Sequence, residues 1–137
     1  MVKIFYDGND AVFGRLASVV TKDLLKGNFV DIINCEGIII SGRKEVFIEN
    51  IQAKRTMGMG SSLKGPKYIR MEDRLVKRMI RGMLPRDRMK GQEAFKRLRC
   101  HIGNGNLSEE DLKNVKEFNH RKPMKYSRIK EIVRGLR

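Results

Sequence analysis

Apolar and polar segments alternate along the first third of the chain and predict a strand, a helix and a second strand. Residues 3–6 form a short apolar run, and a polar turn at 7–10 separates it from residues 14–26, where apolar side chains recur at helical spacing. Gly27 is suited to end that helix, and residues 29–34 form a second apolar run. A strand–helix–strand unit implies parallel pairing with a right-handed crossover.

The pattern then predicts a third strand, a second helix and a long loop. Residues 38–40 are a third apolar run that ends at a Ser–Gly pair. A helix is expected at about 43–53, with its buried side formed by Val46, Phe47, Ile48 and Ile51. The stretch 57–66 is rich in glycine and basic at its edges, so we expect an exposed loop that is not ordered in the free protein.

Two short helices and a final strand are predicted after the loop. Residues 72–83 carry an apolar stripe, and the basic side chains lie mostly on the opposite side of the predicted helix, which Pro85 ends. A further helix is expected at 88–95. Residues 97–102 alternate strictly between polar and apolar types, which predicts a half-buried strand at the edge of the sheet.

The last part of the chain is predicted to contain two helices. Ser108 and Asp111 form an N-terminal capping pattern for a short acidic helix that runs to about Lys116. A second, amphipathic helix near the C-terminus has Ser127 as its expected cap, and its apolar positions are Ile129, Ile132, Val133 and Leu136. A helix this short is marginal alone in water, so it must dock on its own core, on a neighbouring protein or on RNA.

These elements suggest one α/β core with an extension. We expect the core to occupy residues 1–117, with an exposed basic loop near 54–70. Residues 118–137 form a basic connector followed by the C-terminal helix.

The net charge of +14 is distributed very unevenly. Residues 1–50 hold six basic and seven acidic residues, whereas residues 51–137 hold twenty-four basic and nine acidic ones. Such an excess has to be neutralised by a polyanion, either a phosphate backbone or an anionic membrane surface. The apolar runs fall far short of the roughly 20 residues that span a bilayer, and the N-terminus does not read as a signal peptide. We therefore expect a cytoplasmic protein that binds phosphate backbones.

Three segments concentrate the basic residues with almost no acids between them, namely 54–70, 74–90 and 120–137. Arg15 and Arg43 are added because they lie near predicted helix starts, where backbone N–H groups also favour phosphate. Tyr68 and Tyr126 suit base stacking and core packing equally. The remaining phosphate-binding candidates are Lys54, Arg55, Lys64, Lys67, Arg70, Arg74, Arg78, Arg81, Arg86, Arg88, Lys90, Arg121, Lys122, Lys125 and Arg128.

Residues for catalysis or metal binding are few. Cys35 and Cys100 lie far apart in the sequence and are expected to be reduced core residues, while His101 and His120 show no ligand spacing. No glycine motif matches a nucleotide site, so we predict no catalytic residue, no metal and no cofactor. Two alternatives remain: an RNA-acting or nucleotide-using enzyme with His101 or Glu36 in a pocket, and an RNA-binding regulatory protein.

Several short motifs, in this order and spacing, resemble the ribosomal protein L13 family of the large subunit in its archaeal and eukaryotic form. Gly-Arg-Leu-Ala-Ser at 14–18 is similar to the family's opening signature, and Arg-Gly-Met-Leu-Pro at 81–85 to its most recognisable motif. Asn-x-Glu at 34–36 with Ile-Ser-Gly at 40–42, and Lys-Arg-Leu at 96–98 with Gly103, match its later strands. The early first strand favours the archaeal branch.

The resemblance implies a three-layer α/β/α fold around a four-stranded, mainly parallel sheet with strand order 3-2-1-4. It also implies a non-enzymatic constituent of the large ribosomal subunit, bound to large-subunit ribosomal RNA and to neighbouring ribosomal proteins. Such a protein is monomeric within the ribosome, supports subunit assembly and is found on cytoplasmic ribosomes.

Overall fold

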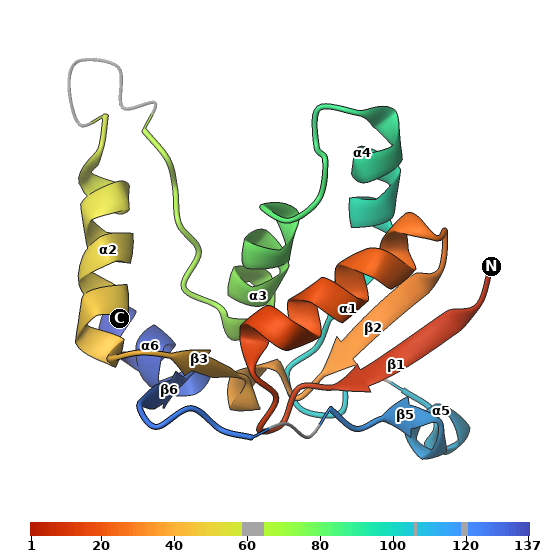
Figure 1. Cartoon of the computed structure of the whole chain (residues 1–137). Coiled ribbons are helices and arrows are strands. Elements are labelled where there is room, and N and C mark those ends of the chain that lie inside the picture. Colours follow the sequence, from red (N-terminus) through yellow and green to blue (C-terminus); the bar gives the residue numbers. More distant parts are fainter. Residues whose placement is uncertain (59–64, 106, 119–120) are drawn as a thin grey trace.

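The computed structural model describes residues 1–58, 65–105, 107–118 and 121–137 (Figure 1). The elements in chain order are β1 (Lys3–Asp7), α1 (Phe13–Leu25), β2 (Phe29–Ile33), the 3-10 helix η1 (Cys35–Gly37), β3 (Ile39–Ser41), α2 (Lys44–Thr56), α3 (Glu72–Arg81), α4 (Met89–Lys96), β4 (Leu98–Cys100), α5 (Glu109–Lys113), β5 (Val115–Lys116), β6 (Tyr126–Arg128) and α6 (Ile129–Leu136).

The main sheet has four parallel strands in the order β4-β2-β1-β5. Numbered among themselves along the chain, these strands have the order 3-2-1-4, and the predicted α/β class is confirmed. The third and fourth strands in this order are Leu98–Cys100 and Val115–Lys116, however, rather than the predicted strands at 38–40 and 97–102. The predicted strand at 97–102 is confirmed as β4 at the sheet edge, but it is not the final strand. The predicted helix to Lys116 is partly wrong, because α5 ends at Lys113 and residues Val115–Lys116 pair with β1 as β5.

The third predicted strand forms, but outside the main sheet. β3 pairs antiparallel with β6, so that Ile39 lies opposite Arg128 and Ser41 opposite Tyr126. The expected helix cap at Ser127 is wrong for the same reason, because Ser127 is the middle residue of β6. Its hydroxyl donates a hydrogen bond of 3.0 Å to the carbonyl of Gly42, and α6 begins after Arg128 without a capping side chain.

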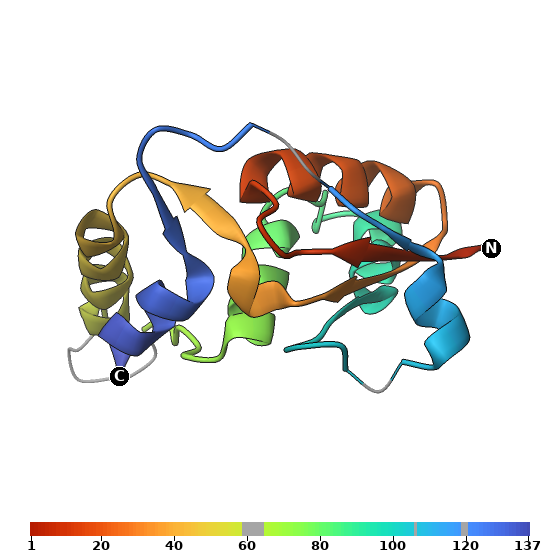
Figure 2. The same ribbon diagram turned by 90° about the horizontal axis from the view of Figure 1, so that it is seen from below.

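Helices cover the sheet unequally. Figures 1 and 2 show α1, α3 and α4 on one face of the sheet and the short α5 on the other. Right-handed crossovers explain this arrangement, because the chain moves one way along the sheet from β1 through β2 to β4 and then returns across it to β5. The main core lies between the sheet and the larger helical layer, and it includes Leu16, Val20, Leu24, Ile32, Leu75, Val76, Ile80 and Leu98.

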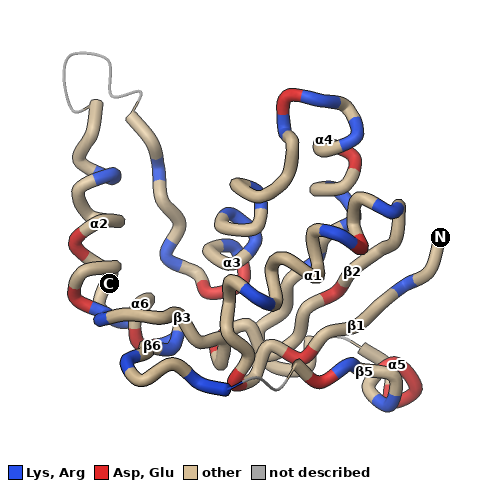
Figure 3. Tube along the Cα trace, viewed as in Figure 1, with Lys and Arg blue, Asp and Glu red and all other residues tan. Residues whose placement is uncertain are grey.

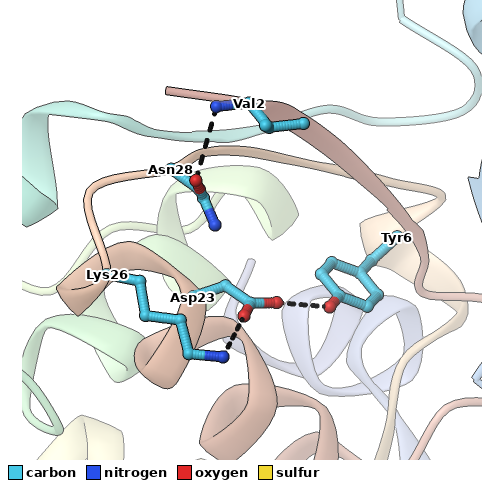
Figure 4. A network of polar contacts seen from close by, with 5 residues as sticks. All are labelled: Val2, Tyr6, Asp23, Lys26 and Asn28. Carbon is cyan, nitrogen blue, oxygen red and sulfur yellow. Dashed lines mark hydrogen bonds and ion pairs between the residues drawn. The ribbon is translucent and has the colours of Figure 1, made fainter.

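The start of the core is fixed by the contact between β1 and α1. The Tyr6 hydroxyl donates a 2.7 Å hydrogen bond to Asp23 on α1, and Lys26 lies 3.5 Å from the other carboxylate oxygen (Figure 4). Burial, followed by the hydrogen bond to Asp23 and the negative charge of that residue, raises the pKa of Tyr6 above its ordinary value. Gly27 has a φ of 99°, a left-handed conformation that suits glycine and ends α1 as predicted.

Helices α2 and α3 follow the predicted patterns with two differences. On α2, Ile51 is buried and Phe47 and Ile48 are partly buried, but Val46 is 55% exposed, so its predicted burial is wrong. Met83 is also outside the apolar stripe, at 44% exposure, because α3 ends at Arg81. The expectation that the loop at 57–66 is not ordered falls mainly on residues 59–64, which lie outside the described residues.

The C-terminal helix docks on its own chain. Ile129, Ile132 and Val133 are fully buried and Leu136 is 3% exposed, and all four belong to the main core. Helix α6 packs against α2, η1 and α3. Of the three docking partners considered from the sequence, the chain's own core is therefore the one that this helix contacts.

Replacing Ile132 with alanine should lower the free energy of unfolding by about 2–5 kcal/mol, because it removes a large side chain from a packed core. Urea unfolding followed by circular dichroism measures the change. Val46→Ala on the exposed side of α2 is the matched control and should change the free energy by about 0.5 kcal/mol or less. Equal effects of the two substitutions would show that α6 does not pack as described.

Candidate nucleic-acid interface

Within the described part of the chain, most candidate cations form no ion pair with an acidic side chain. The ion pairs among the described residues are Lys3–Asp31, Lys26–Asp23, His101–Asp31, Lys122–Asp10 and Arg128–Asp10. Of the candidate cations, only Lys122 and Arg128 take part in such a pair. Figure 3 shows basic positions along α3 and around α4, and it also shows acidic positions on α2, at the start of α3 and around α4. Positive charge on this part of the surface is therefore left for an external anion to neutralise.

The densest group of cations lines the groove between α3 and α4, which we call the α3–α4 groove. It consists of two neighbouring hollows of about 280 and 160 Å³ that share Arg81 and Phe95. Ile69, Leu84 and Phe95 are its apolar lining residues, and no acid contributes to its described lining. The cations that line it are Arg74, Lys77, Arg78, Arg81, Arg86 and Lys96.

The local sequence explains how the groove is built. Arg74, Lys77, Arg78 and Arg81 are three or four residues apart on α3, so they share one side of the helix while Leu75, Val76 and Ile80 enter the core. The chain then turns at Pro85 into α4. At Gly91 a side chain would collide with the carbonyl of Pro85, so glycine is required for α4 to pack this closely against the turn.

The Arg81 guanidinium lies in an unfavourable electrostatic environment. Partial burial, together with the like charges of Arg86 and Arg78, lowers the pKa of Arg81 from its ordinary value. The group remains charged, since an arginine pKa is far above neutrality. An anion bound in the groove would relieve the repulsion among these three residues.

The Tyr68 ring contacts one cation of α2 and one of α3. The Arg78 guanidinium lies 4.2 Å from the centre of the Tyr68 ring, and the Lys54 ammonium lies 5.6 Å from it. Arg78 also donates a 2.9 Å hydrogen bond to the carbonyl of Lys67. Tyr68 therefore orders two candidate cations and packs against the core, whereas Tyr126 is 43% exposed.

Two further basic hollows lie around the connector and β3. Arg15, Arg121 and Lys122 line one of about 370 Å³, beside the first turn of α1. Arg43, Lys44 and Lys125 line the other, of about 350 Å³, together with Tyr126, Ser127 and the carboxylates of Glu45 and Glu131. Residues distant in sequence are thus brought together, although the second hollow is less purely basic than the α3–α4 groove.

Asp10 holds the connector against the start of the fold. Its carboxylate lies 3.2 Å from the Lys122 ammonium and 3.0 Å from the Arg128 guanidinium. The hydrogen bond from Lys122, with the charges of Lys122 and Arg128, lowers the pKa of Asp10 despite an opposing effect of burial. Lys122 and Arg128 are therefore partly neutralised within the protein.

The structure brings nine of the candidate residues together in two places. Arg74, Arg78, Arg81 and Arg86 meet in the α3–α4 groove, and Arg15, Arg43, Arg121, Lys122 and Lys125 line the two hollows by the connector. Lys64 lies outside the described residues. The other candidates line none of these hollows: Lys54 and Arg55 on α2, Lys67 and Arg70 between α2 and α3, Arg88 and Lys90 at the start of α4, and Arg128 at the end of β6.

Four cations that line hollows were missed as candidates from the sequence. Lys77 and Lys96 lie in the α3–α4 groove, and Lys44 lies beside Arg43. Arg99 lines a separate hollow beside β4. The helical spacing of Lys77 with Arg74, Arg78 and Arg81 was a signal that could have identified it.

The residues considered for an enzyme have structural partners. His101 lies 3.8 Å from the buried carboxylate of Asp31, which also pairs with Lys3 at 3.3 Å. Both carboxylate oxygens of Glu36 lie 3.1 Å from the Gly103 N–H, which donates to them. No group of three or more potential metal ligands occurs in the described ranges. Among these same residues, no helix has the length and apolar character needed to cross a bilayer.

The fold and this surface define a basic α/β protein with unpaired cations grouped in grooves. Comparison with known proteins gives a narrower result, because the family described as Ribosomal protein L13 matches residues 2–107. The chain belongs to the ribosomal protein L13 family, a family of structural rather than enzymatic proteins. The resemblance drawn from the sequence is thereby confirmed.

Three archaeal relatives carry the name "Large ribosomal subunit protein uL13". That of Methanopyrus kandleri is 46% identical over 104 residues, which cover 76% of this chain and 64% of the relative. That of Methanocaldococcus jannaschii is 36% identical over 132 residues, which cover 95% of this chain and 94% of the relative. That of Haloarcula marismortui is 36% identical over 101 residues, which cover 74% of this chain and 68% of the relative. The chain thus matches just under two thirds of the first of these proteins and nearly all of the second.

Asp10→Asn should destabilise the protein at neutral pH by about 1 kcal/mol or less, because the ion pairs are partly exposed. Asparagine tolerates the φ of 56° at this position, so the backbone should be unchanged. Since folding lowers the pKa of Asp10, its stabilisation is present above the ordinary value of 3.8 and is lost as the pH falls through the lowered value. Urea unfolding across this range should show the two proteins converging at low pH.

Asp87→Asn is the control for this measurement, because Asp87 forms no ion pair with any described residue. It should have no comparable pH-dependent effect. A difference between wild type and Asp10→Asn that persists unchanged at the acid end would contradict the ion-pair explanation.

Proposed function

We propose that this protein is a structural constituent of the large ribosomal subunit that binds ribosomal RNA and supports subunit assembly. Family membership and the name of the relatives support the ribosomal role. The observation that carries the RNA-binding proposal is the α3–α4 groove, where six cations line the surface without an acidic neighbour among the described lining residues.

The proposed mechanism is neutralisation of phosphates on a preformed surface. Lysine and arginine side chains displace counterions from the RNA backbone, and arginine can hold one phosphate through two hydrogen bonds. Because side chains cannot enter the deep major groove of A-form RNA, recognition depends on backbone and shape rather than on duplex sequence. Arg81 is central, since a phosphate beside it would offset both its partial burial and its repulsion by Arg78 and Arg86.

The connector would provide a second contact. Arg15 and Arg121 line one hollow near the start of α1, and Lys125 lines the next with Arg43. Lys122 and Arg128 already pair with Asp10, so they would contribute less to RNA affinity than the groove arginines. The rigid core between the groove and the connector would hold two RNA segments at a fixed separation, which is how a small protein can support assembly.

The remaining candidates would extend these two contacts. Lys54, Arg55, Lys64, Lys67 and Arg70 would bind RNA from the loop region, and Arg88 and Lys90 from the start of α4. In this proposal the protein is monomeric within cytoplasmic ribosomes, and its other neighbours are large-subunit proteins.

Sedimentation tests the ribosomal role. The full-length protein should migrate with large subunits through a sucrose gradient and remain bound after a high-salt wash. Loss into the free fraction during the wash, with binding to isolated RNA retained, would instead indicate an RNA-binding regulator that acts away from the ribosome.

The double substitution Arg81→Gln and Arg86→Gln should weaken binding to large-subunit RNA fragments by about tenfold or more, because charged hydrogen bonds are lost. Fluorescence anisotropy at several salt concentrations measures this. The slope of log affinity against log salt should become shallower by roughly one for each lost phosphate contact.

Lys26→Gln is the matched control, since Lys26 is exposed and lies on the nearly neutral N-terminal part of the chain. It should leave affinity and slope almost unchanged. If Lys26→Gln weakened binding as strongly as the groove variant, the positive charge would act as a whole and the groove would have no special role.

A further inference from the structure

The fold brings together the two cysteines of the chain, which the sequence separates by more than sixty positions. Cys100 ends β4 and lies in register with Ile32 of β2, and Cys35 begins η1 just after that strand. The backbone N–H of Cys35 donates a 3.1 Å hydrogen bond to the carbonyl of His101, the residue next to Cys100. The two cysteines therefore lie beside each other where β4 ends and η1 begins, and both are free.

The two thiols differ in accessibility. Cys35 is fully buried, and its sulfur also lies 3.6 Å from the carbonyl oxygen of Ile32. The hydrogen bond to Cys100, followed by burial, raises the pKa of the Cys35 thiol above its ordinary value. Cys100 is only partly buried and lines a surface hollow of about 350 Å³ between α3 and β4. Cys100 is therefore the more accessible of the two residues.

The hollow at Cys100 is basic. Its lining consists of Asp73, Arg74, Lys77, Arg99, Cys100 and His101, so three permanent cations face one carboxylate. Positive charge around the hollow attracts reagents that carry negative charge. Small anionic disulfides, the class to which glutathione disulfide belongs, fit this environment.

We propose that Cys35 and Cys100 form a reactive dithiol that small anionic disulfides oxidise to an internal disulfide, with Cys100 as the point of entry. The backbone already holds the two cysteines side by side in the reduced protein, because the register of β4 with β2 and the hydrogen bond from Cys35 to His101 fix the junction of η1 and β4. The bond would cross-link that junction beneath α3, which packs against both elements.

The chemistry consists of two balanced exchanges. The Cys100 thiolate attacks one sulfur of the disulfide, which forms a Cys100–reagent mixed disulfide and releases one reagent thiolate. Cys35 then loses its proton to solvent and attacks the Cys100 sulfur, which releases the second reagent thiolate. The protein loses two electrons and two protons, and the reagent is reduced to two thiols.

The experiment incubates the full-length reduced protein with glutathione disulfide under native conditions and follows the products by mass spectrometry. We expect the intact mass to fall by two hydrogen atoms, with non-reducing peptide mapping linking Cys35 to Cys100. Because the bond closes a long loop, the melting temperature should rise by about 5 °C or more. A reductant should reverse both changes.

Variants identify the order of the two steps. Cys35→Ser should accumulate a stable glutathione adduct at Cys100, and Cys35→Ala should do the same if the serine variant folds poorly. Cys100→Ser should remain unmodified for as long as it stays folded. Arg74→Gln with Arg99→Gln should slow the reaction with glutathione disulfide more than that with the cationic disulfide cystamine.

The alternative outcomes would overturn the proposal. These are a persistent glutathione adduct on the wild-type protein, a disulfide-linked dimer, rapid modification of Cys35 in Cys100→Ser, or oxidation only in urea. None of these results bears on RNA binding, so the dithiol and the proposed function can fail independently.

Discussion

The apolar packing of α3 against the sheet is the interaction on which the rest of the structure depends. Leu75, Val76 and Ile80 are almost fully buried on one side of this helix, while its other side carries cations that repel one another. Burying side chains of this size contributes roughly 1.5–3 kcal/mol each, enough to hold like charges that would otherwise separate. The core therefore maintains an arrangement of charge that the free protein does not neutralise by itself.

The two parts of the chain have different roles in the structure. The nearly neutral β1–α1–β2 unit supplies the centre of the sheet and much of the core, and some of its charges are locally paired, as in the contacts of Asp23 with Lys26 and of Asp31 with Lys3. The later part supplies the groove and the connector. Asp10 is the point where the halves meet electrostatically, because it holds Lys122 and Arg128 close to the first turn. This explains why cations of equal formal charge are unequal in their availability to a ligand.

Local patterns predicted most elements, because helical and strand periodicity depend on neighbouring residues. The sequence placed α1, β2, α3 and β4 to within a few residues, and the family resemblance supplied the strand order. Pairing between distant segments was not accessible in this way. Nothing near Ser127 indicates that it pairs with β3, and nothing in Val115–Lys116 outweighs the preceding helical pattern until β1 provides a partner. The division into a core at 1–117 and an extension at 118–137 stays a prediction, and α6 shares the main core.

The basic segments of the candidate interface could be predicted from the sequence, but the spatial arrangement of their side chains could not. The basic segments were visible as runs, yet only the fold shows that Arg81 and Arg86 share one hollow, that Lys122 is already paired and that Cys100 lies beside Cys35. The most direct test of the central claim is photo-cross-linking of large-subunit RNA to the protein, followed by peptide mapping. The account predicts cross-links concentrated in residues 67–99 and 121–128. Cross-links concentrated in residues 16–33, on α1 and β2, would contradict it.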